Sequence, residues 1–94
     1  MLDDVKTALR ISQSSTAFDM EIQDLIEAAR LDLEQSGISS EKAKDDNDPL
    51  IKRAIIVYCK ANFGYDSNTS AERFHDSYVM LKQHLSLAGD YNVG

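Results

Sequence analysis

The chain is organised by apolar residues that recur with helical spacing. Leu2, Val5 and Leu9 are three and four residues apart, which predicts a short amphipathic helix over residues 2–10. A longer run with the same period predicts a second helix, whose apolar stripe consists of Phe18, Ile22, Leu25, Ile26, Ala29 and Leu33. Mostly polar side chains occupy its other faces, so the second helix should cover a core with one side and meet solvent with the other.

Residues at both ends of the second helix predict where it begins and ends. Thr16 followed by Asp19 is a variant of the capping box, in which a hydroxyl and a carboxylate serve the first backbone amides. Gly37 suits the left-handed conformation that commonly stops a helix. Residues 38–48 show no sustained period and end in turn-forming residues, so we expect an exposed loop there.

The third predicted helix is the most apolar part of the chain. Asp48 followed by Pro49 is a strong helix start, because an acidic N-cap precedes a residue that needs no amide partner. Between residues 50 and 63 apolar side chains cover most of the circumference and leave a narrow edge for Lys52, Arg53 and Lys60. Such a helix is expected at the centre of a fold or in an interface, and Gly64 should end it.

A fourth helix is predicted near the C-terminus. After a polar connection that begins at Tyr65, Thr69 or Ser70 can cap the helix, with Glu72 completing the capping box. Its buried stripe consists of Phe74, Tyr78, Leu81 and Leu85.

Length and composition favour a single all-α domain. A chain of 94 residues that is 43% apolar can bury one modest core, and its one proline and four glycines favour helices. We predict a small bundle of about four helices over residues 1–87. Residues 88–94 lack regular spacing and should form an extended, flexible tail, although Leu87 and Tyr91 are apolar anchors that a purely solvated end does not need.

The net charge of −6 narrows the range of partners. Sixteen acidic residues against ten basic ones repel phosphate backbones, which argues against general nucleic-acid binding. An acidic wall around a channel would nevertheless let DNA slide past without sticking. Cys59 is the only cysteine, which excludes an intrachain disulfide and suits a reducing compartment. No secretory signal or membrane span is recognisable, so we expect a soluble protein of the cytosol unless it is packaged into a particle.

The residues that could carry chemistry are better explained without it. His75 and His84 are nine residues apart, which places them on different faces of a helix rather than on one metal-binding edge. Asp45, Asp46 and Asp48 lack the glycine and the bidentate glutamate of a calcium loop. Nucleophile motifs and glycine-rich phosphate loops are absent. We therefore predict no enzyme, no cofactor and no metal site.

Two other functional classes compete with a purely structural role. A helix-turn-helix DNA reader is disfavoured, because Lys52, Arg53 and Lys60 lie on a helix too apolar to enter a groove. The carboxylates of residues 19–34 support a second alternative, an acidic regulator that mimics DNA or binds a basic partner.

Two blocks of the sequence carry a family resemblance. The first runs from Leu9-Arg10-Ile11 across a polar gap to the segment 19–29, and the second runs from Asp48 to Ile55 and on to Phe63. Together with the final helix and its tail, these blocks resemble the small head-tail connector (adaptor) proteins of long-tailed bacteriophages. Ser12 departs from the family pattern, in which an acid is common.

The resemblance implies a structural virion protein that docks on the portal protein, self-associates into a dodecameric ring and extends the DNA channel toward the next head-tail completion or tail protein. Genomic DNA would pass through without specific binding, at the head-tail interface of the virion, after assembly in the host cytoplasm. Matching positions place Leu85, Leu87 and Tyr91 at the portal-docking end. The channel- or tail-facing loop would contain Glu41, Lys44, Asp45 and Asp46. Packing between subunits would use Ile56, Cys59 and Phe63.

Overall fold

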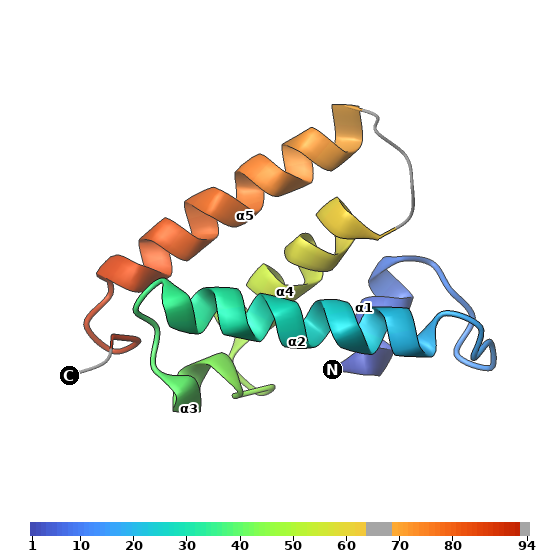
Figure 1. The fold of residues 1–94 in the computed structure, drawn as a ribbon, viewed down its shortest axis with the longest axis horizontal. Coiled ribbons are helices and arrows are strands. Elements are labelled where there is room, and N and C mark those ends of the chain that lie inside the picture. The colour runs from blue at the N-terminus through green and yellow to red at the C-terminus, as the bar shows by residue number, and fades with distance from the viewer. Residues whose placement is uncertain (64–68, 93–94) are drawn as a thin grey trace.

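Helices make up most of the chain that the structure describes, which is residues 1–63 and 69–92 (Figure 1). The computed structural model confirms the all-α prediction. Its helices are α1 (Leu2–Ala8), α2 (Asp19–Gln35), α3 (Ser40–Ala43), α4 (Pro49–Asn62) and α5 (Thr69–Leu87). Within the described ranges, the only β-type pairing is an isolated bridge between Ile38 and Asn92.

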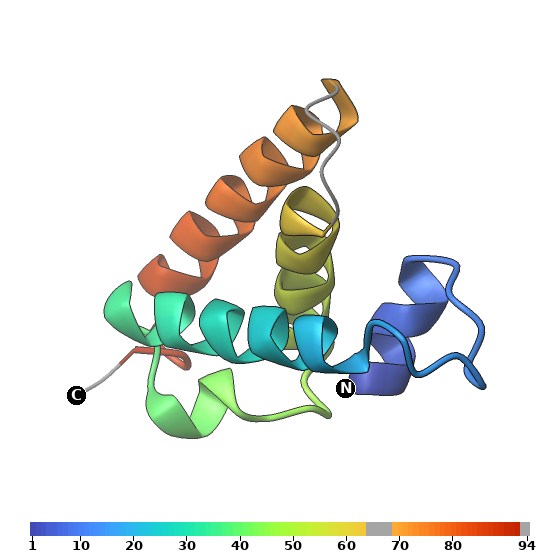
Figure 2. The same ribbon diagram turned by 45° about the vertical axis from the view of Figure 1, so that its right-hand side comes forward.

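α4 occupies the centre of the fold, in agreement with its apolar circumference. α5, α2 and α1 all pack against it, and in Figures 1 and 2 α2 crosses beneath α4 and α5. The fully buried side chains of α4 are Ile51, Ala54, Ile55, Val57 and Cys59. Burial of each large apolar side chain contributes roughly 1.5–3 kcal/mol, so this helix supplies a large part of the drive to fold.

Two of the predicted helix boundaries are confirmed by backbone geometry. One carboxylate oxygen of Asp48 accepts the amides of Leu50 at 2.9 Å and Ile51 at 3.2 Å, which caps α4. α2 ends at Gln35, and Gly37 follows with a φ of +101°, a conformation that side chains with a Cβ rarely adopt.

The predicted capping box at the start of α2 is wrong. Phe18 occupies the N-cap position, and no side chain caps the helix. Thr16 instead accepts the Asp19 amide through its backbone carbonyl at 3.3 Å. Phe18 is 45% exposed and packs edge-on against Phe63, with ring centroids 5.4 Å apart, so it does not belong to the buried stripe.

The expected loop over residues 38–48 contains the short helix α3. The Ser39 hydroxyl caps it by accepting the Lys42 amide at 3.2 Å. Ile38 and Ala43 are fully buried, so this segment is attached to the core rather than free in solvent. A four-residue helix is too short to show a period in the sequence, and its stability comes from these tertiary contacts.

The fourth predicted helix is confirmed as α5. Tyr78 and Leu85 from its predicted stripe are buried, and Phe74 and Leu81 pack against the same core. The predicted end of α4 at Gly64, most of the polar connection after it and the capping side chains of α5 fall outside the part that the structure describes.

Residues 88–92 turn back onto α3 and the start of α4. The Ser39 amide donates to the Tyr91 carbonyl at 2.7 Å, and the Tyr91 hydroxyl donates to Asp48 at 2.8 Å. We expected a flexible tail beyond Leu87, whereas this part of it makes defined contacts because Tyr91 finds an acceptor in Asp48.

A buried lysine joins α1 to α2. Lys6 is 2% exposed, and its ammonium group lies 2.9 Å from the Asp19 carboxylate. The same group donates to the backbone carbonyls of Gln13 at 3.1 Å and Ser15 at 2.5 Å. The polar segment between the two helices thus wraps around the Lys6 ammonium group. Hydrophobic spacing in the sequence does not predict this contact.

A second polar cluster joins α2 to α5. Asp32 accepts hydrogen bonds from the Tyr78 hydroxyl at 2.5 Å and from Lys82 at 3.0 Å. Burial opposes ionisation of Asp32, but these two hydrogen bonds outweigh it and hold the pKa of the carboxyl below its usual value. Burial and the bond to Asp32 raise the pKa of the Tyr78 hydroxyl, so the proton stays on the tyrosine.

Replacing Lys6 with methionine tests the buried ion pair. The methionine keeps most of the apolar stem but leaves Asp19 and two backbone carbonyls without the ammonium group. Because Asp19 is 28% exposed, water recovers part of the loss, and we expect the free energy of unfolding to fall by about 2 kcal/mol. Urea denaturation followed by circular dichroism measures the change. The exposed Lys44→Met is the matched control, and equal stability of the two variants would contradict the assignment.

Candidate interaction surfaces

The described residues contain no cluster suited to metal binding. Among them, no group of three or more His, Cys, Asp or Glu side chains converges. His75 and His84 are both exposed, as expected of two helix positions on different faces. Cys59 is buried, and burial raises the pKa of its thiol to about 12, so the group stays protonated near neutral pH. No described helix is long and apolar enough to cross a membrane.

The three residues expected at the portal-docking end lie in different environments. Leu85 is 1% exposed and belongs to the core, whereas Leu87 at the last position of α5 is 84% exposed. Tyr91 is half-buried in the returning segment. Figure 1 shows this end of α5 close to the end of α2 and to the C-terminus. Leu87 is therefore the one residue of the three that offers a large exposed apolar side chain to a partner.

Asp48 and Tyr91 form a contact that we call the C-terminal clasp. The side chain of Asp48 is 9% exposed, and Lys42 lies 4.0 Å from its carboxylate and 5.3 Å from the centroid of the Tyr91 ring. Burial opposes ionisation of Asp48, but the bonds from Tyr91 and from the first amides of α4, with Lys42 nearby, hold its pKa below the usual value. The hydrogen bond to this carboxylate raises the pKa of Tyr91.

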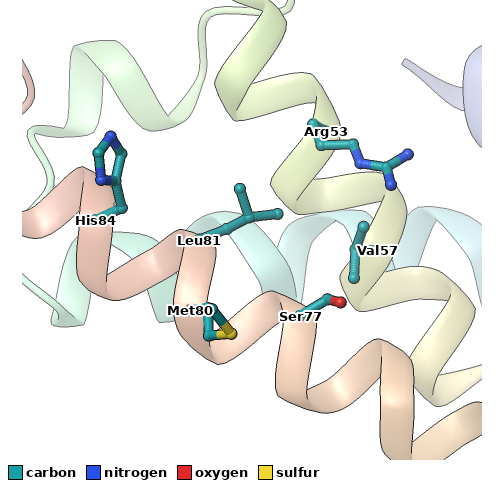
Figure 3. A pocket seen from close by; sticks show the side chains of 6 residues that line it. All are labelled: Arg53, Val57, Ser77, Met80, Leu81 and His84. Carbon is teal, nitrogen blue, oxygen red and sulfur yellow. The ribbon is translucent and has the colours of Figure 1, made fainter.

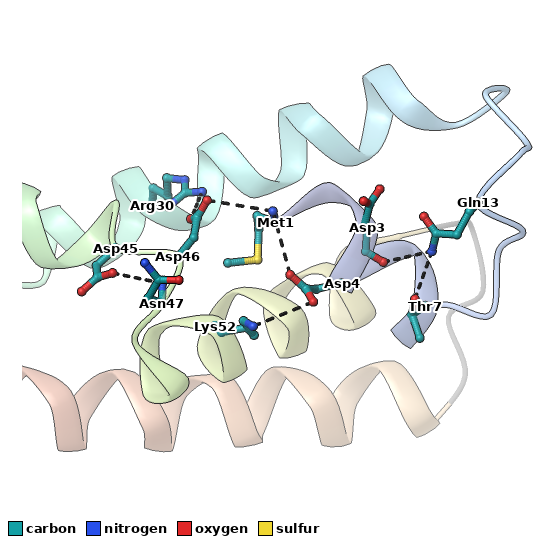
Figure 4. Close-up of polar contacts among 10 residues, drawn as sticks. All are labelled: Met1, Asp3, Asp4, Thr7, Gln13, Arg30, Asp45, Asp46, Asn47 and Lys52. Carbon is teal, nitrogen blue, oxygen red and sulfur yellow. Dashed lines mark hydrogen bonds and ion pairs between the residues drawn. The ribbon is translucent and has the colours of Figure 1, made fainter.

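One of the predicted channel- or tail-facing residues, Asp46, makes ion pairs within the monomer. Asp46 lies 2.7 Å from the guanidinium of Arg30, which also donates to the Ala43 carbonyl at 3.0 Å (Figure 4). The N-terminal amino group of Met1 lies 3.9 Å from the same carboxylate. Asp46 thus ties the segment after α3 to α2 and to the start of the chain.

The other three residues of that predicted set differ in exposure. Asp45 accepts the Asn47 amide at 3.0 Å, a local turn that is also drawn in Figure 4. Glu41 and Lys44 are exposed on and just after α3. These two side chains, of opposite charge, are the ones that a neighbouring molecule could reach without any rearrangement.

The residues expected to pack between subunits are only partly on the surface. Cys59 is fully buried within the monomer. Ile56 and Phe63 are partly buried and pack against the same core. Any contact that this region makes with another molecule therefore runs through Ile56 and Phe63.

A groove between α4 and α5, which we call the α4–α5 groove, was not anticipated from the sequence. It has a volume of about 480 Å³ and is lined by Arg53, Val57, Ser77, Met80, Leu81 and His84 (Figure 3). A neighbouring hollow of about 270 Å³ shares three of these residues and adds Arg73 and Phe74. Arg53 and Arg73 have no ion-pair partner among the residues the structure describes. The sequence of either helix alone does not predict the groove, because the groove forms only when the two helices pack.

The outer face of α2 presents a row that we call the α2 ridge, consisting of Met20, Asp24, Glu27 and Leu31. These residues are spaced four, three and four apart, so they share one face of the helix. All four are exposed, Met20 by 83% and Leu31 by 56%. At 100° per residue the ridge lies opposite the buried stripe that contains Ile22 and Ile26. Two carboxylates thus stand between two exposed apolar side chains.

Comparison with known proteins gives one match that covers nearly the whole chain. A family model described as phage connector protein matches residues 1–92, which include every helix from α1 to α5. No curated protein and no solved structure matches the chain.

Replacing Tyr91 with phenylalanine tests the C-terminal clasp. We expect the free energy of unfolding to fall by about 1 kcal/mol near neutral pH, because one hydrogen bond to a carboxylate is lost. The pKa of Asp48 is lowered from 3.8 by folding, so its contacts stabilise fully above that pH and weaken as pH falls through the lower folded value. The difference between wild type and variant should therefore shrink below pH 3.8.

Urea denaturation over this pH range measures the effect. Tyr58→Phe is the control, because the Tyr58 hydroxyl donates no hydrogen bond within the described part of the chain. A difference between wild type and Tyr91→Phe that stays constant with pH would contradict a clasp based on ionised Asp48.

Proposed function

The chain belongs to the phage connector protein family, and we propose from this membership that it forms a dodecameric ring on the portal vertex. As a connector it is a structural protein of the phage particle that associates with portal or tail components. In our proposal the ring extends the DNA channel and offers the surface to which the next head-tail completion or tail protein attaches. The family match over residues 1–92 is the observation that carries this proposal.

The charge of the chain supports the passage of DNA through such a ring. With a net charge of −6 on each subunit, a ring would repel the phosphate backbone and would not retain the genome by nonspecific binding. We assign the segment with Glu41, Lys44, Asp45 and Asp46 to the channel or to the tail-side partner. Glu41 and Lys44 would make direct contacts, and Asp46 would hold the segment through Arg30.

We assign the end of α5 to portal docking. Leu87 is the exposed anchor, and the Tyr91–Asp48 clasp fixes the segment that follows it. Leu85 is buried and would act by supporting Leu87 from the core rather than by touching the portal. Ile56 and Phe63 would take part in packing between subunits, with Cys59 beneath them in the core.

Quantitative mass spectrometry of purified virions tests the proposed position in the particle. We expect about one copy of this chain for each portal subunit, because a dodecameric ring stacked on a dodecameric portal requires equal numbers. Absence from mature particles would overturn the connector assignment for this chain. It would favour the acidic regulator, which acts in the host and is not packaged.

The substitution Leu87→Asp tests the docking end. A charged group in place of a central apolar anchor should weaken binding to the purified portal protein at least about tenfold. The free energy of unfolding should change by no more than about 0.5 kcal/mol, because Leu87 is largely exposed. Ala17→Asp adds the same charge at an exposed position before α2 and should leave portal binding unchanged. Equal portal affinity of the two variants would contradict this docking surface.

A further inference from the structure

We propose that the α4–α5 groove of one copy of this chain binds the α2 ridge of a second copy, in a head-to-tail contact. The inference rests on the proposed function, since a ring is built from one contact repeated between copies. It adds two faces to the subunit packing assigned above to Ile56 and Phe63, neither of which lines the groove or belongs to the ridge.

The two surfaces match in length. The ridge extends from Met20 to Leu31, which is eleven helical steps along α2. Along α5, the groove with its neighbouring hollow extends from Arg73 to His84, which is also eleven steps. At 1.5 Å per residue both distances are about 16 Å, so one helix face can lie along the other for its full length.

The two surfaces also match in charge. The ridge carries Asp24 and Glu27, and the only ion-pair contact of either in the described ranges is a 3.9 Å approach of Glu27 to Arg30. The groove carries Arg53 and the neighbouring hollow carries Arg73. The described part of the chain supplies no carboxylate partner for either. Complementary charges on the two surfaces fix the register of a contact and exclude the pairing of like surfaces.

Apolar side chains stand beside the charges on both surfaces. Met20 and Leu31 are exposed at the two ends of the ridge, and Met80 on the groove is 70% exposed. Val57 and Leu81 also line the groove. Removing the exposed side chains of Met20, Leu31 and Met80 from water supplies the affinity, while the charges supply orientation.

The positions of the two surfaces require a head-to-tail arrangement. The ridge points away from the core, and the groove opens on the side of α4 and α5 that faces away from α2, which runs behind them in Figure 3. One copy therefore uses a different face for each neighbour. A contact of this kind does not close as a two-fold dimer but continues from copy to copy into a ring or a filament.

Cross-linking between two variants of the full chain, each with one added cysteine, tests the contact. Gln23→Cys places a thiol beside the ridge and Ser77→Cys places one in the groove, and both leave the four charged residues intact. The native Cys59 is buried and contributes little background. The two variants are mixed at high concentration with a short bis-maleimide, and peptide mass spectrometry identifies the linked positions.

We expect the 23-to-77 product to form about tenfold faster than the product of a control mixture of Ser12→Cys and Ser77→Cys. Ser12 is exposed in the loop between α1 and α2, outside both surfaces. Equal rates in the two mixtures would overturn the proposal. A predominance of 23-to-23 or 77-to-77 products would also overturn it, because like faces would then be meeting.

Charge reversal tests the pairing of the two surfaces. Arg53→Glu in the Ser77→Cys chain should lower the yield of the 23-to-77 product about tenfold, and Glu27→Arg in the Gln23→Cys chain should restore part of it. Lys44→Glu is the matched control, because it reverses an exposed charge outside the groove and should leave the yield unchanged. An unchanged yield with Arg53→Glu would overturn the assigned pairing.

The cross-linking experiment and the mass spectrometry of virions test different claims. Virions that contain the chain in portal-like amounts, without preferential 23-to-77 cross-linking, would retain the connector and reject these two faces. Preferential cross-linking of a chain that is missing from virions would retain the self-contact and reject the connector assignment.

Discussion

The rest of the structure depends on the need to remove α4 from water on nearly every side. A helix whose apolar residues cover most of its circumference cannot lie on a surface, so it must be covered by several other elements at once. Ile51, Ile55 and Val57 point into the core that α1, α2 and α5 close around this helix. α1, α2 and α5 each need only one apolar face, and that face is directed toward α4, whereas α3 packs on α2.

Covering α4 brings together polar groups that are far apart in the sequence, and three of the contacts that satisfy them join neighbouring elements. Lys6 meets Asp19 and two loop carbonyls, Asp32 meets Tyr78 and Lys82, and Asp48 meets Tyr91. Each contact attaches one covering element to its neighbour. Asp48 serves twice, because one carboxylate oxygen caps α4 and the other accepts the hydroxyl of the returning C-terminal segment. The start of the central helix and the end of the described chain are therefore coupled through a single side chain.

The same packing leaves exposed carboxylates on the outer face of α2 and two arginines between α4 and α5. α2 keeps Asp24 and Glu27 on the face turned away from the core, while α4 and α5 leave Arg53 in their groove and Arg73 in the neighbouring hollow. An acidic protein thus carries a local basic strip that its net charge of −6 conceals. A molecule with such polarity is suited to contacts that repeat in one direction, which is the kind of contact a ring on a phage particle needs.

The sequence by itself determined the class of fold, the four longer helices and the family. Periodic apolar positions, the Asp48-Pro49 start and the Gly37 stop act within a few residues of one another, so their consequences can be read locally. The resemblance to phage connectors could be recognised for the same reason, because it consists of helix lengths and spacings.

Only the tertiary structure decided the remaining features, because each depends on residues that are distant in the chain. α3 exists because Ile38 and Ala43 reach the core, and Lys6 is buried because a later loop supplies its acceptors. The same holds for the predicted docking and packing residues. Leu85 and Cys59 have the apolar character that led to their selection, but that character serves the interior, whereas Leu87 remains outside. Hydrophobic spacing predicts that a side chain will be buried, but it does not distinguish burial in the core from burial against a partner.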